Sequence, residues 1–464
     1  MKMRWAGYWL CVVLGWTCVL GVPAKTDRPN MVIVMGDDVS WTAFGCTETP
    51  YAAHTPHIDT LASQGMRFSN FFCAVATCTP VRTELYTGLL PPHSGVYANG
   101  CPLKPGTEHM VQYLKALGYR VGLTGKHHFD RIDDFERIEG FEVDCVKPDP
   151  NWNMEGVTSF VKDAQRKGQN FCLVIASIHP HAVLVDGDPS RYPPEEIVLP
   201  PHFVDTPATR TMLSKQMAEI TELDRQVGAT MALLEEEGLA GDTLMLFLSE
   251  QGNAMARGKW SIHDWGNRAV CIARWPGHIE AGSCTDAIAQ YCDIVPTFID
   301  VAGGAPLDHL DGKSLLKVLE GKTKTHRKQA YLSYGKAQHY QRGVVDQRYK
   351  LIWTMDPSIP YASSAVVTPK NNQKWYAKAW REWEAQAAVN EQAKAQVERC
   401  LTYEEFMLFD VQADPFELTN LADNPENAGL VKRMHEQLLA QMKQLGDDVS
   451  QPIVKKKRRK GRGH

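Results

Sequence analysis

Four apolar segments of strand length each end in a cluster of polar or ionisable residues, and this pattern constrains the fold of the chain most strongly. The segments are 31–35, 119–124, 171–178 and 244–248. The clusters that follow them, in the same order, are Gly36-Asp37-Asp38, Gly125-Lys126-His127-His128, His179-Pro180-His181 and Ser249-Glu250-Gln251-Gly252. Continuous apolar strands are typical of a parallel sheet covered on both faces. Ligands of open α/β sheets bind beyond the carboxyl ends of the strands, so we expect these clusters to form a single site.

The segments between these strands have the spacing of helices. Apolar residues recur at helical intervals from Met110 to Leu117, with Thr107 as a cap and Gly118 as a stop. A longer helix is predicted from 213 to 238. The alternation of strand and helix predicts an α/β fold with a large, mixed but mostly parallel sheet sandwiched by helices.

The pattern changes after about residue 335. Short β-rich segments at 329–334, 348–354 and 407–411 and a helix at 428–445 predict a smaller antiparallel sheet with one helix. Between them, 372–400 is expected to be a helix. We interpret its stripe as a packing surface rather than a platform for a sugar. The residues of the stripe are Tyr376, Trp380, Trp383 and Ala387.

Both ends of the chain differ in composition from the rest. Lys2, Arg4, the apolar run 9–20 and the small residues at 22–24 predict a secretory signal, and no later run is long enough to span a bilayer. We therefore expect a soluble protein that is secreted or periplasmic and has no nucleic-acid partner. The segment 455–462 carries seven basic residues and predicts a disordered tail, with a tether for a polyanion as the alternative. The expected division is a signal peptide at 1–24, a catalytic domain at 25–335, a C-terminal α+β subdomain at 336–450 and a basic tail at 451–464.

Two pairs of strand-end residues have the chemistry of metal ligands. Asp37-Asp38 and Glu250-Gln251 offer oxygen atoms, which a hard divalent cation prefers. A helix cap or turn is the alternative for the first pair, and an ordinary loop for the second. Their joint position at strand ends favours the metal site.

The run Cys78-Thr79-Pro80-Val81-Arg82 places a cysteine ahead of a proline that suits the first turn of a helix, and Thr87-Gly88 closes that helix. A nucleophile there lies where backbone N–H groups and the helix dipole favour negative charge. On these five residues alone, a buried cysteine before a helix is the alternative reading. The pattern C-x-P-x-R resembles the motif of type I sulfatases, whose cysteine is oxidised to formylglycine and whose aldehyde hydrate attacks a sulfate ester.

Several other segments resemble the same family, which lies in the alkaline phosphatase superfamily. Gly118-Tyr119-Arg120 with Gly125-Lys126-His127-His128 is similar to G-Y-x-T-x-x-x-G-K-W-H, and 258–268 is similar to G-K-x-x-x-Y-E-G-G-x-R. Further landmarks are Pro180-His181, 274–277, 293–297, 311–315, 348–351, 408–410, 414–415 and 420–421. The resemblance implies an alkaline-phosphatase-like fold with a smaller C-terminal subdomain.

The resemblance also implies cofactors and roles for particular residues. The cofactors are one Ca²⁺ and formylglycine formed from Cys78, with a formylglycine-generating maturation enzyme as a partner. The implied metal ligands are Asp37, Asp38, Cys78, Glu250 and Gln251, and the implied catalytic residues are Cys78, Arg82, Lys126, His128, His181 and Lys259. In the family scheme Arg82, Lys126 and Lys259 neutralise charge on the sulfuryl group. His181 protonates the leaving group, and His128 helps the hydrate to expel sulfate.

The chain departs from the family pattern at three places. Val81 stands where serine or alanine is usual, and Glu250-Gln251 stands where Asp-Asn or Asp-His is usual. Glutamate is one methylene longer than aspartate, so either the strand end sits slightly further back or the metal shifts. Both side chains still offer oxygen, so we expect calcium to bind. Asp264-Trp265 replaces Glu-Gly, and the bulky Trp265 is expected to narrow the substrate cleft. Three nearby histidines have no assigned role: His127, His179 and His263. Structural or surface placement is favoured for His179 and His263, and the lining of the substrate pocket is the alternative.

Cysteine usage leaves disulfide bonding open. Of the twelve cysteines, Cys11 and Cys18 leave with the signal and Cys78 is the proposed nucleophile, so nine remain. An odd number in a chain of this size excludes a disulfide framework, although one or two bridges stay possible.

The sequence therefore predicts an exported sulfatase that cleaves a sulfate ester or an N-sulfate of a sulfated saccharide. A phosphate or phosphonate monoester hydrolase of the same superfamily is one alternative. A catalytically silent binder of sulfated glycans is another, although retention of all the catalytic residues argues against it. The stretches expected to set specificity are 130–153, 183–205 and 361–400. The substrate, the position of its sulfate and the oligomeric state are left open.

Overall fold

The computed structural model describes residues 28–141, 152–336, 339–361, 363, 365–366 and 374–449. Its largest element is a nine-stranded sheet with the order β4-β3-β5-β1-β6-β7-β2-β8, in which β9 also pairs with β2. The strands are β1 Asn30–Met35, β2 Met66–Phe72, β3 Arg120–Gly125, β4 Glu136–Arg137, β5 Phe171–Ala176, β6 Thr243–Leu248, β7 Arg268–Arg274, β8 Ser283–Thr285 and β9 Ala289–Gln290.

The four strands predicted from apolar runs are β1, β3, β5 and β6, and they lie next to one another in the middle of the sheet. β1 pairs in parallel with both β5 and β6, and β3 pairs in parallel with β5. Every residue of β1, β5 and β6 is buried, which explains why their sequences are apolar without alternation. Antiparallel pairing of β7 with β6 and β2 makes the sheet mixed, so the predicted fold class is confirmed.

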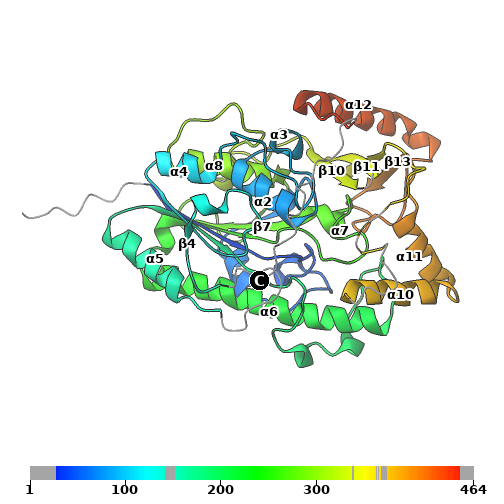
Figure 1. Cartoon of the computed structure of the whole chain (residues 1–464), viewed down its shortest axis with the longest axis horizontal. Helices are drawn as coiled ribbons and strands as arrows, with labels where there is room; N and C mark the ends of the chain where they lie inside the picture. Colours follow the sequence, from blue (N-terminus) through cyan, green and yellow to red (C-terminus); the bar gives the residue numbers. More distant parts are fainter. Residues whose placement is uncertain are drawn as a thin grey trace, which may run out of the picture.

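Helices cover both faces of this sheet (Figure 1). Met31, Ile33 and Met35 of β1 belong to a core shared with α2, α4 and α8. Val32 and Val34, which point to the opposite face, belong to a second core shared with α1, α5 and α6. The helices of this part are α1 Pro56–Ser63, α2 Cys78–Thr87, α3 Pro91–Ser94, α4 Met110–Ala116, α5 Glu155–Arg166, α6 Pro207–Glu236, α7 Asp264–Asn267, α8 Ile294–Val301 and α9 Leu316–Leu319.

A second, antiparallel sheet follows, with the order β10-β11-β12-β13. One of its faces packs against α12 through residues such as Tyr331 and Leu438. The other face, which includes Leu332, shares a core with α10, α11 and the loops of the first part. The elements are β10 Ala330–Lys336, β11 His339–Val345, β12 Tyr349–Thr354, β13 Phe406–Asp410, α10 Trp375–Ala387, α11 Glu391–Leu401 and α12 Ala428–Leu445.

Two helix predictions need correction. The segment 372–400 is not one helix, because α10 ends at Ala387 and a new helix starts after Asn390, whose side chain accepts a hydrogen bond from the backbone N–H of Ala393 at 2.9 Å. The helix predicted after Thr107 starts at Met110 instead, because His109 and Gln112 form a capping box there. The stripe of Tyr376, Trp380 and Trp383 is buried, as expected for packing.

Some predictions fall outside the described residues. The signal peptide at 1–24 and the basic tail at 451–464 lie in segments that the structure does not describe, and the domain division stays a prediction. Within the described part, no helix combines the length and apolar character needed to cross a bilayer. Eight of the cysteines that the structure describes are free thiols: Cys46, Cys73, Cys78, Cys172, Cys271, Cys284, Cys292 and Cys400.

Candidate active site

The polar residues that follow β1, β3, β5 and β6 meet at one edge of the large sheet. Because these strands are parallel neighbours, their carboxyl ends share that edge. The residues are Asp37 and Asp38 after β1, Lys126 after β3, His181 after β5, and Glu250 and Gln251 after β6. The structure therefore brings together residues that lie far apart in the chain. Gln251 and Asp38, for example, are in contact although they are 213 positions apart.

Helix α2 delivers Cys78 to the same place. The helix begins at Cys78, with Thr77 as its N-cap, and ends at Gly88, whose φ of 71° only glycine adopts readily. The Cys78 side chain is buried, and its Sγ lies 3.6 Å from Oδ1 of Asp37 and 3.7 Å from Oδ1 of Asp38. The first turn of α2 thus places residue 78 against the two aspartates.

Three buried cations surround residue 78. Nζ of Lys259 lies 2.9 Å from Sγ of Cys78 and donates to Oδ1 of Asp38 at 2.6 Å. Nζ of Lys126 lies 3.6 Å from the same sulfur and pairs with Asp37. One turn along α2, Arg82 pairs with Glu250 at 2.7 Å.

The charges at this centre fix the ionisation of its members. Burial raises the pKa of Asp37, but the charges of Lys126 and then His181 outweigh burial and hold that pKa well below its usual value. Burial lowers the pKa of Lys259, but the charges of its acidic neighbours, Asp38 first among them, together outweigh burial and raise the pKa well above the ordinary range. Burial and then the charge of Glu250 raise the pKa of the Cys78 thiol. The lysine is therefore a cation and Asp37 is a carboxylate at neutral pH, whereas Cys78 is a thiol.

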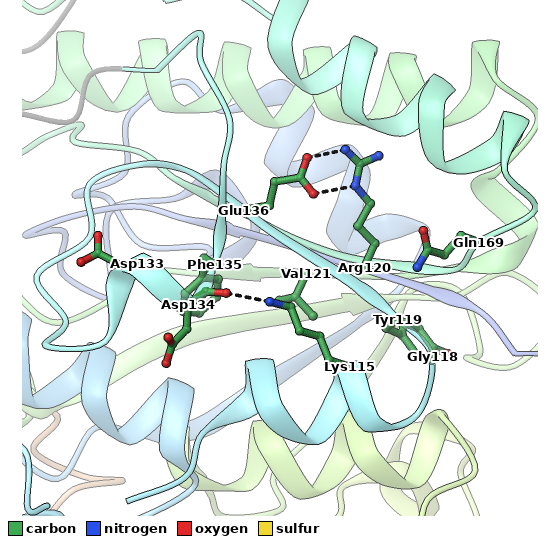
Figure 2. Close-up of a pocket in the computed structure, with 10 residues that line it drawn as sticks. All are labelled: Lys115, Gly118, Tyr119, Arg120, Val121, Asp133, Asp134, Phe135, Glu136 and Gln169. Carbon is green, nitrogen blue, oxygen red and sulfur yellow. Dashed lines mark hydrogen bonds and ion pairs between the residues drawn. The ribbon is translucent and has the colours of Figure 1, made fainter. Parts of the chain in front are cut away.

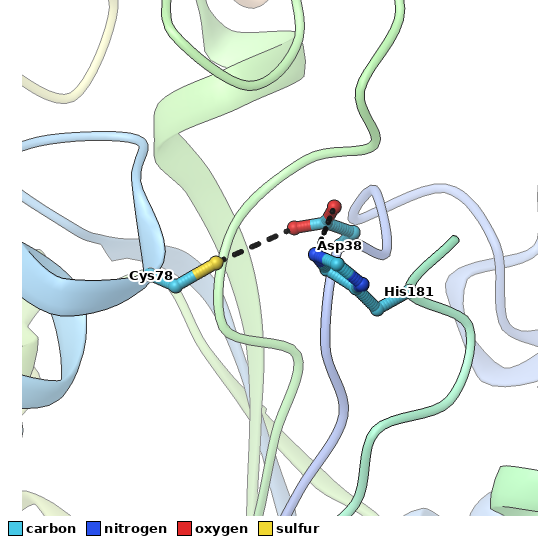
Figure 3. A group of neighbouring side chains, drawn as sticks. All are labelled: Asp38, Cys78 and His181. Atoms are coloured by element: carbon cyan, nitrogen blue, oxygen red, sulfur yellow. Dashed lines mark hydrogen bonds and ion pairs between the residues drawn. The ribbon is translucent and has the colours of Figure 1, made fainter. Parts of the chain in front are cut away.

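His181 stands at the open side of the centre. Its Nε2 lies 3.7 Å from Oδ2 of Asp38, and Figure 3 shows Asp38 between His181 and Cys78. Its Nδ1 lies 2.7 Å from the carbonyl oxygen of Ala182, to which it donates, so Nε2 is left facing the centre. The His181 side chain is 21% exposed, whereas those of Asp37, Arg82 and Lys126 are 0% exposed.

His128 lies close enough to the cations for their charges to act on it. Burial, followed by the charges of Lys126 and Arg82, lowers the pKa of His128 to about 3. The backbone at His128 also has a positive φ of 41°. His128 is therefore a neutral imidazole at neutral pH.

Backbone strain concentrates at and beside this centre. Seven non-glycine residues of the described chain have positive φ, and the only one remote from the centre and its neighbouring loop is Glu48. The other six are Asp38, His128, Glu250, Arg257, Trp260 and Glu417. Such conformations cost about 1–3 kcal/mol each and persist only where the surroundings over-determine them. They mark this edge of the sheet as a functional site.

The oxygen atoms of the centre fit a bound divalent cation. One ligand atom from each of Asp37, Asp38, Cys78 and Glu250 lies within 4.8 Å of all the others. Oε2 of Glu250 and Oε1 of Gln251 are buried without a hydrogen-bond partner among the described residues, whereas Oε1 of Glu250 pairs with Arg82. Buried oxygen atoms of this kind are the ligands that Ca²⁺ prefers.

Several other residues singled out in the sequence lie away from the centre. Trp265 does not narrow an open cleft, which corrects the prediction: it is buried, donates through Nε1 to Asn253 at 3.0 Å and packs against His202. His179 pairs with Asp186 at 2.9 Å, and His263 lies 2.5 Å from Glu417. His127 has a pKa lowered by burial and is half-buried.

A separate hollow of about 490 Å³ lies at the opposite, amino-terminal end of β3 (Figure 2). Its two basic side chains are already engaged, since Arg120 pairs with Glu136 and Lys115 donates to the carbonyl oxygen of Asp134 at 2.9 Å. None of the residues that meet at Cys78 lines it. The candidate active site is therefore the centre around Cys78 and not this hollow.

The family model described as Sulfatase matches residues 29–305, and the model described as N-sulphoglucosamine sulphohydrolase, C-terminal, matches residues 258–359. An ulvan-active sulfatase of Formosa agariphila is 28% identical over 448 residues, which cover 93% of this chain and 83% of that protein. The complex of BT4656 with its substrate D-glucosamine-2-N,6-O-disulfate superposes with a TM-score of 0.70 at 19% identity, covering 91% of this chain and 99% of the other. The phosphonate monoester hydrolase of Agrobacterium radiobacter superposes with a TM-score of 0.69 at 18% identity, covering 90% and 96%.

The fold and the cation-lined centre define a hydrolase of the alkaline phosphatase superfamily that acts on an anionic ester. Since the match to the Sulfatase model covers more than half of the 464 residues, the chain belongs to the sulfatase family. It is a sulfuric ester hydrolase.

Proposed function

We propose that this enzyme removes sulfate from a saccharide, with a formylglycine at residue 78 and one calcium ion in its centre. The observation that carries the proposal is the ring of Arg82, Lys126 and Lys259 around residue 78. These three cations are balanced by the carboxylates of Asp37, Asp38 and Glu250. A divalent cation would add two positive charges to this paired set, so the loaded centre would attract an anionic group.

Each residue of this centre has a proposed role that its position supports. Asp37, Asp38, Glu250 and Gln251 would hold the ion through their oxygen atoms. When present, the ion supplies a fixed positive charge and the hydrated aldehyde at residue 78 supplies the nucleophile. Lys126 and Lys259 bind the sulfuryl oxygens, since both ammonium groups already point at residue 78.

Proton transfer falls to the two histidines. Nε2 of His181 faces the centre from its open side, so it is placed to give its proton to a leaving oxygen there. Because Nδ1 already donates to a carbonyl oxygen, His181 has to be an imidazolium in this step. Burial lowers the pKa of His181, but the charges of Asp38 and Asp37 favour that charged form. His128 is a neutral imidazole beside Lys126 and Arg82, so it can accept a proton from the hydroxyl group at residue 78. Arg82, held by Glu250, fixes the first turn of α2 relative to the end of β6.

The relatives support a saccharide substrate. One relative is described as active on ulvan, and one structural neighbour was solved with a disulfated glucosamine as its substrate. The matched C-terminal model takes its name from an enzyme that acts on N-sulphoglucosamine, so both an ester and an N-sulfate stay within the proposal. Export from the cell and a maturation enzyme for residue 78 belong to the same proposal.

The structural likeness to a phosphonate monoester hydrolase keeps one alternative open. The decisive experiment is mass spectrometry of the peptide that contains residue 78, after expression together with a maturation enzyme. We expect an aldehyde at this position, and a thiol alone would contradict the proposal.

Paired assays then separate the reaction types. We expect 4-nitrophenyl sulfate to be hydrolysed faster than 4-nitrophenyl phosphate. A preference for phosphate would identify the chain as a phosphoester hydrolase, and turnover of neither by protein that carries the aldehyde would identify a silent binder of sulfated glycans. A panel of defined sulfated saccharides identifies the substrate.

A further inference from the structure

A second group of buried charges lies beside the centre and involves the C-terminal part of the chain. We call it the Glu417 cluster, and it comprises Arg257, His263, Asp264, Lys350 and Glu417. Glu417 and Lys350 belong to the C-terminal part, whereas the other three lie on the loop that carries Lys259. All five residues are buried. Ionised groups rarely occupy such a position unless their partners hold them.

The carboxylate of Glu417 is the hub of this cluster. Its Oε1 lies 2.9 Å from Nζ of Lys350, and its Oε2 accepts from the backbone N–H of Asp264 at 3.2 Å. Oε2 also lies 2.5 Å from Nδ1 of His263, which donates because an ionised carboxylate is the stronger acceptor. Burial raises the pKa of Glu417, but the charge of Lys350 together with the contacts of His263 and Arg257 outweighs burial, so the pKa lies far below its usual value. Glu417 is therefore an anion at neutral pH.

These contacts hold the loop on both sides of Lys259. On the amino-terminal side, Nη2 of Arg257 donates to the carbonyl oxygen of Glu417 at 2.8 Å. On the carboxyl-terminal side, His263 and Asp264 contact the Glu417 carboxylate. Lys350 reinforces that side, because its Nζ also donates to Oδ1 of Asp264 at 2.8 Å. One residue from the C-terminal part thus fixes two points that flank Lys259.

The loop needs such support because its backbone is strained. Arg257 and Trp260 have φ values of 63° and 68°, and they flank Lys259 closely. Residues other than glycine rarely adopt this left-handed backbone conformation, and it persists only when neighbouring groups impose it. Within the loop, the backbone N–H of Lys259 donates to the carbonyl oxygen of Asn253 at 2.7 Å. Release of the loop would let Lys259 move away from residue 78.

We infer that Glu417 is a positioning residue: through the loop that it holds, the C-terminal part sets the place of the Lys259 ammonium at the reaction centre. This inference rests on the proposed function, in which Lys259 binds the sulfuryl group. It assigns to the C-terminal part a share in catalysis although none of its residues touches residue 78 in the described structure.

The test compares Glu417→Gln with a matched control, Asp447→Asn. Asp447 is also a buried carboxylate of the C-terminal part and is held by Arg342 at 3.0 Å and by Tyr97 at 2.9 Å, but it does not contact the Lys259 loop. Both variants remove one buried charge, so both are expected to melt at lower temperature. Assays are run well below both melting temperatures, with 4-nitrophenyl sulfate as the substrate and inorganic sulfate as the inhibitor.

We expect kcat of Glu417→Gln to fall by about tenfold to a hundredfold, and inhibition by inorganic sulfate to weaken by about tenfold, because a displacement near 1 Å has effects of this size. Asp447→Asn should keep both quantities within about twofold, since distant, independent sites do not couple. A merely structural role for Glu417 would give the two variants equal kinetics, and that result would overturn the inference.

A second variant keeps the test valid if Glu417→Gln fails to fold. His263→Gln leaves every charge in place, because burial and the charge of Arg257 lower the pKa of His263 to about 4 and the imidazole is neutral at pH 7. It is expected to show the same weakened inhibition by sulfate, and unchanged kinetics would overturn the inference. An inactive wild-type enzyme would instead overturn the proposed function itself, so the two failures are distinguishable.

Discussion

His181 and Lys126 show how burial decides which single residue gives the clearer test of the mechanism. Lys126 is fully buried and paired with Asp37, so its removal leaves an uncompensated carboxylate and costs about 3–5 kcal/mol of stability. His181 is partly exposed and forms no close ion pair, because its nearest carboxylate oxygen is 3.7 Å away. Replacement of His181 therefore separates chemistry from folding more cleanly than replacement of Lys126.

The first prediction follows from this difference. His181→Ala should lower kcat by about 10²–10⁴, the usual contribution of a general acid. Its melting temperature should stay within about 2 °C of the wild type, since a change of 1 kcal/mol moves larger domains by about 2–4 °C. Substantial activity in this variant would refute the assignment of His181. Lys126→Ala should lose turnover as well, with a clear loss of stability.

The second prediction concerns acid stability and His202. This imidazole is buried among Phe203, Trp265 and Phe416, and neither nitrogen has a hydrogen-bond partner among the described residues. Burial, followed by the charge of Arg257, lowers the pKa of His202 well below the ordinary value of histidine. A depressed pKa gives stability that is present above the unfolded value and is lost as pH falls below it.

Replacement of His202 tests this directly. His202→Phe removes the proton uptake of the unfolded chain and sacrifices no hydrogen bond to a described residue. From pH 7 to pH 5 its free energy of unfolding should therefore fall by about 2 kcal/mol less than that of the wild type. Urea titrations at both pH values measure this difference, and equal losses in the two proteins would contradict the placement of a neutral histidine there.

Prediction from sequence succeeded at residue scale where a residue lies in a local motif. Cys78 and Arg82 share one helix, and the strand-end pairs follow apolar runs, so each group could be identified from its local sequence. Glu417 was not identified from the sequence because it lies 154 positions from His263 in the chain, with no motif around it. Trp265 was misplaced because a sequence does not tell whether a bulky ring faces a cleft or a core.

At the scale of elements, the central strands were predictable because both of their faces are buried, which leaves an uninterrupted apolar run. Strand β2 lacks this signal, since three of its residues are only half-buried, and it was not identified. The break between α10 and α11 was missed because the cap at Asn390 sits inside an otherwise helical pattern. Caps of this kind decide helix ends more than composition does.

The third prediction concerns the loop that leaves β6. A Cβ at Gly252 would lie 1.8 Å from the carbonyl oxygen of Trp265, which is backbone and cannot swing aside. Gly252→Ala should therefore push the end of β6, with Glu250 and Gln251, away from the Lys259 loop. We expect activity to fall by at least about a hundredfold, because displacements of 1 Å have this effect.

A control for this substitution lies at the other end of the same strand. Gly241, just before β6, has open space around an added Cβ and no positive φ. Gly241→Ala should keep activity and melting temperature close to those of the wild type. If the two variants behaved alike in kinetic assays, the close packing of the two loops at Gly252 would not matter for the reaction.

At the scale of the whole molecule, the two sheets act as one support for the centre. The large sheet supplies the strand ends that form the centre. The smaller sheet and the loop that follows it hold the Lys259 loop through Lys350 and Glu417. Truncation after the large sheet would therefore remove the partners of Arg257, His263 and Asp264.

The fourth prediction concerns the ion. A ligand that binds only the folded state stabilises it by about 2.7 kcal/mol at a concentration one hundred times its Kd. Calcium should therefore raise the melting temperature of the wild type over that in EDTA, with a rise that depends on concentration. Asp38→Asn removes one oxygen anion from the cluster and should reduce the shift. Equal melting temperatures of the wild type in calcium and in EDTA would contradict the metal site.

The pairing of charges at the strand ends has a consequence for how the enzyme is assembled. Each acidic group there already has a basic neighbour: Lys126 for Asp37, Lys259 for Asp38 and Arg82 for Glu250. The polypeptide can therefore fold around these groups before any ion binds, and the proposed calcium ion would enter a site that is already formed. Folding and binding of the proposed ion would then be separate events. A shortage of calcium would leave a folded but inactive protein rather than an aggregate.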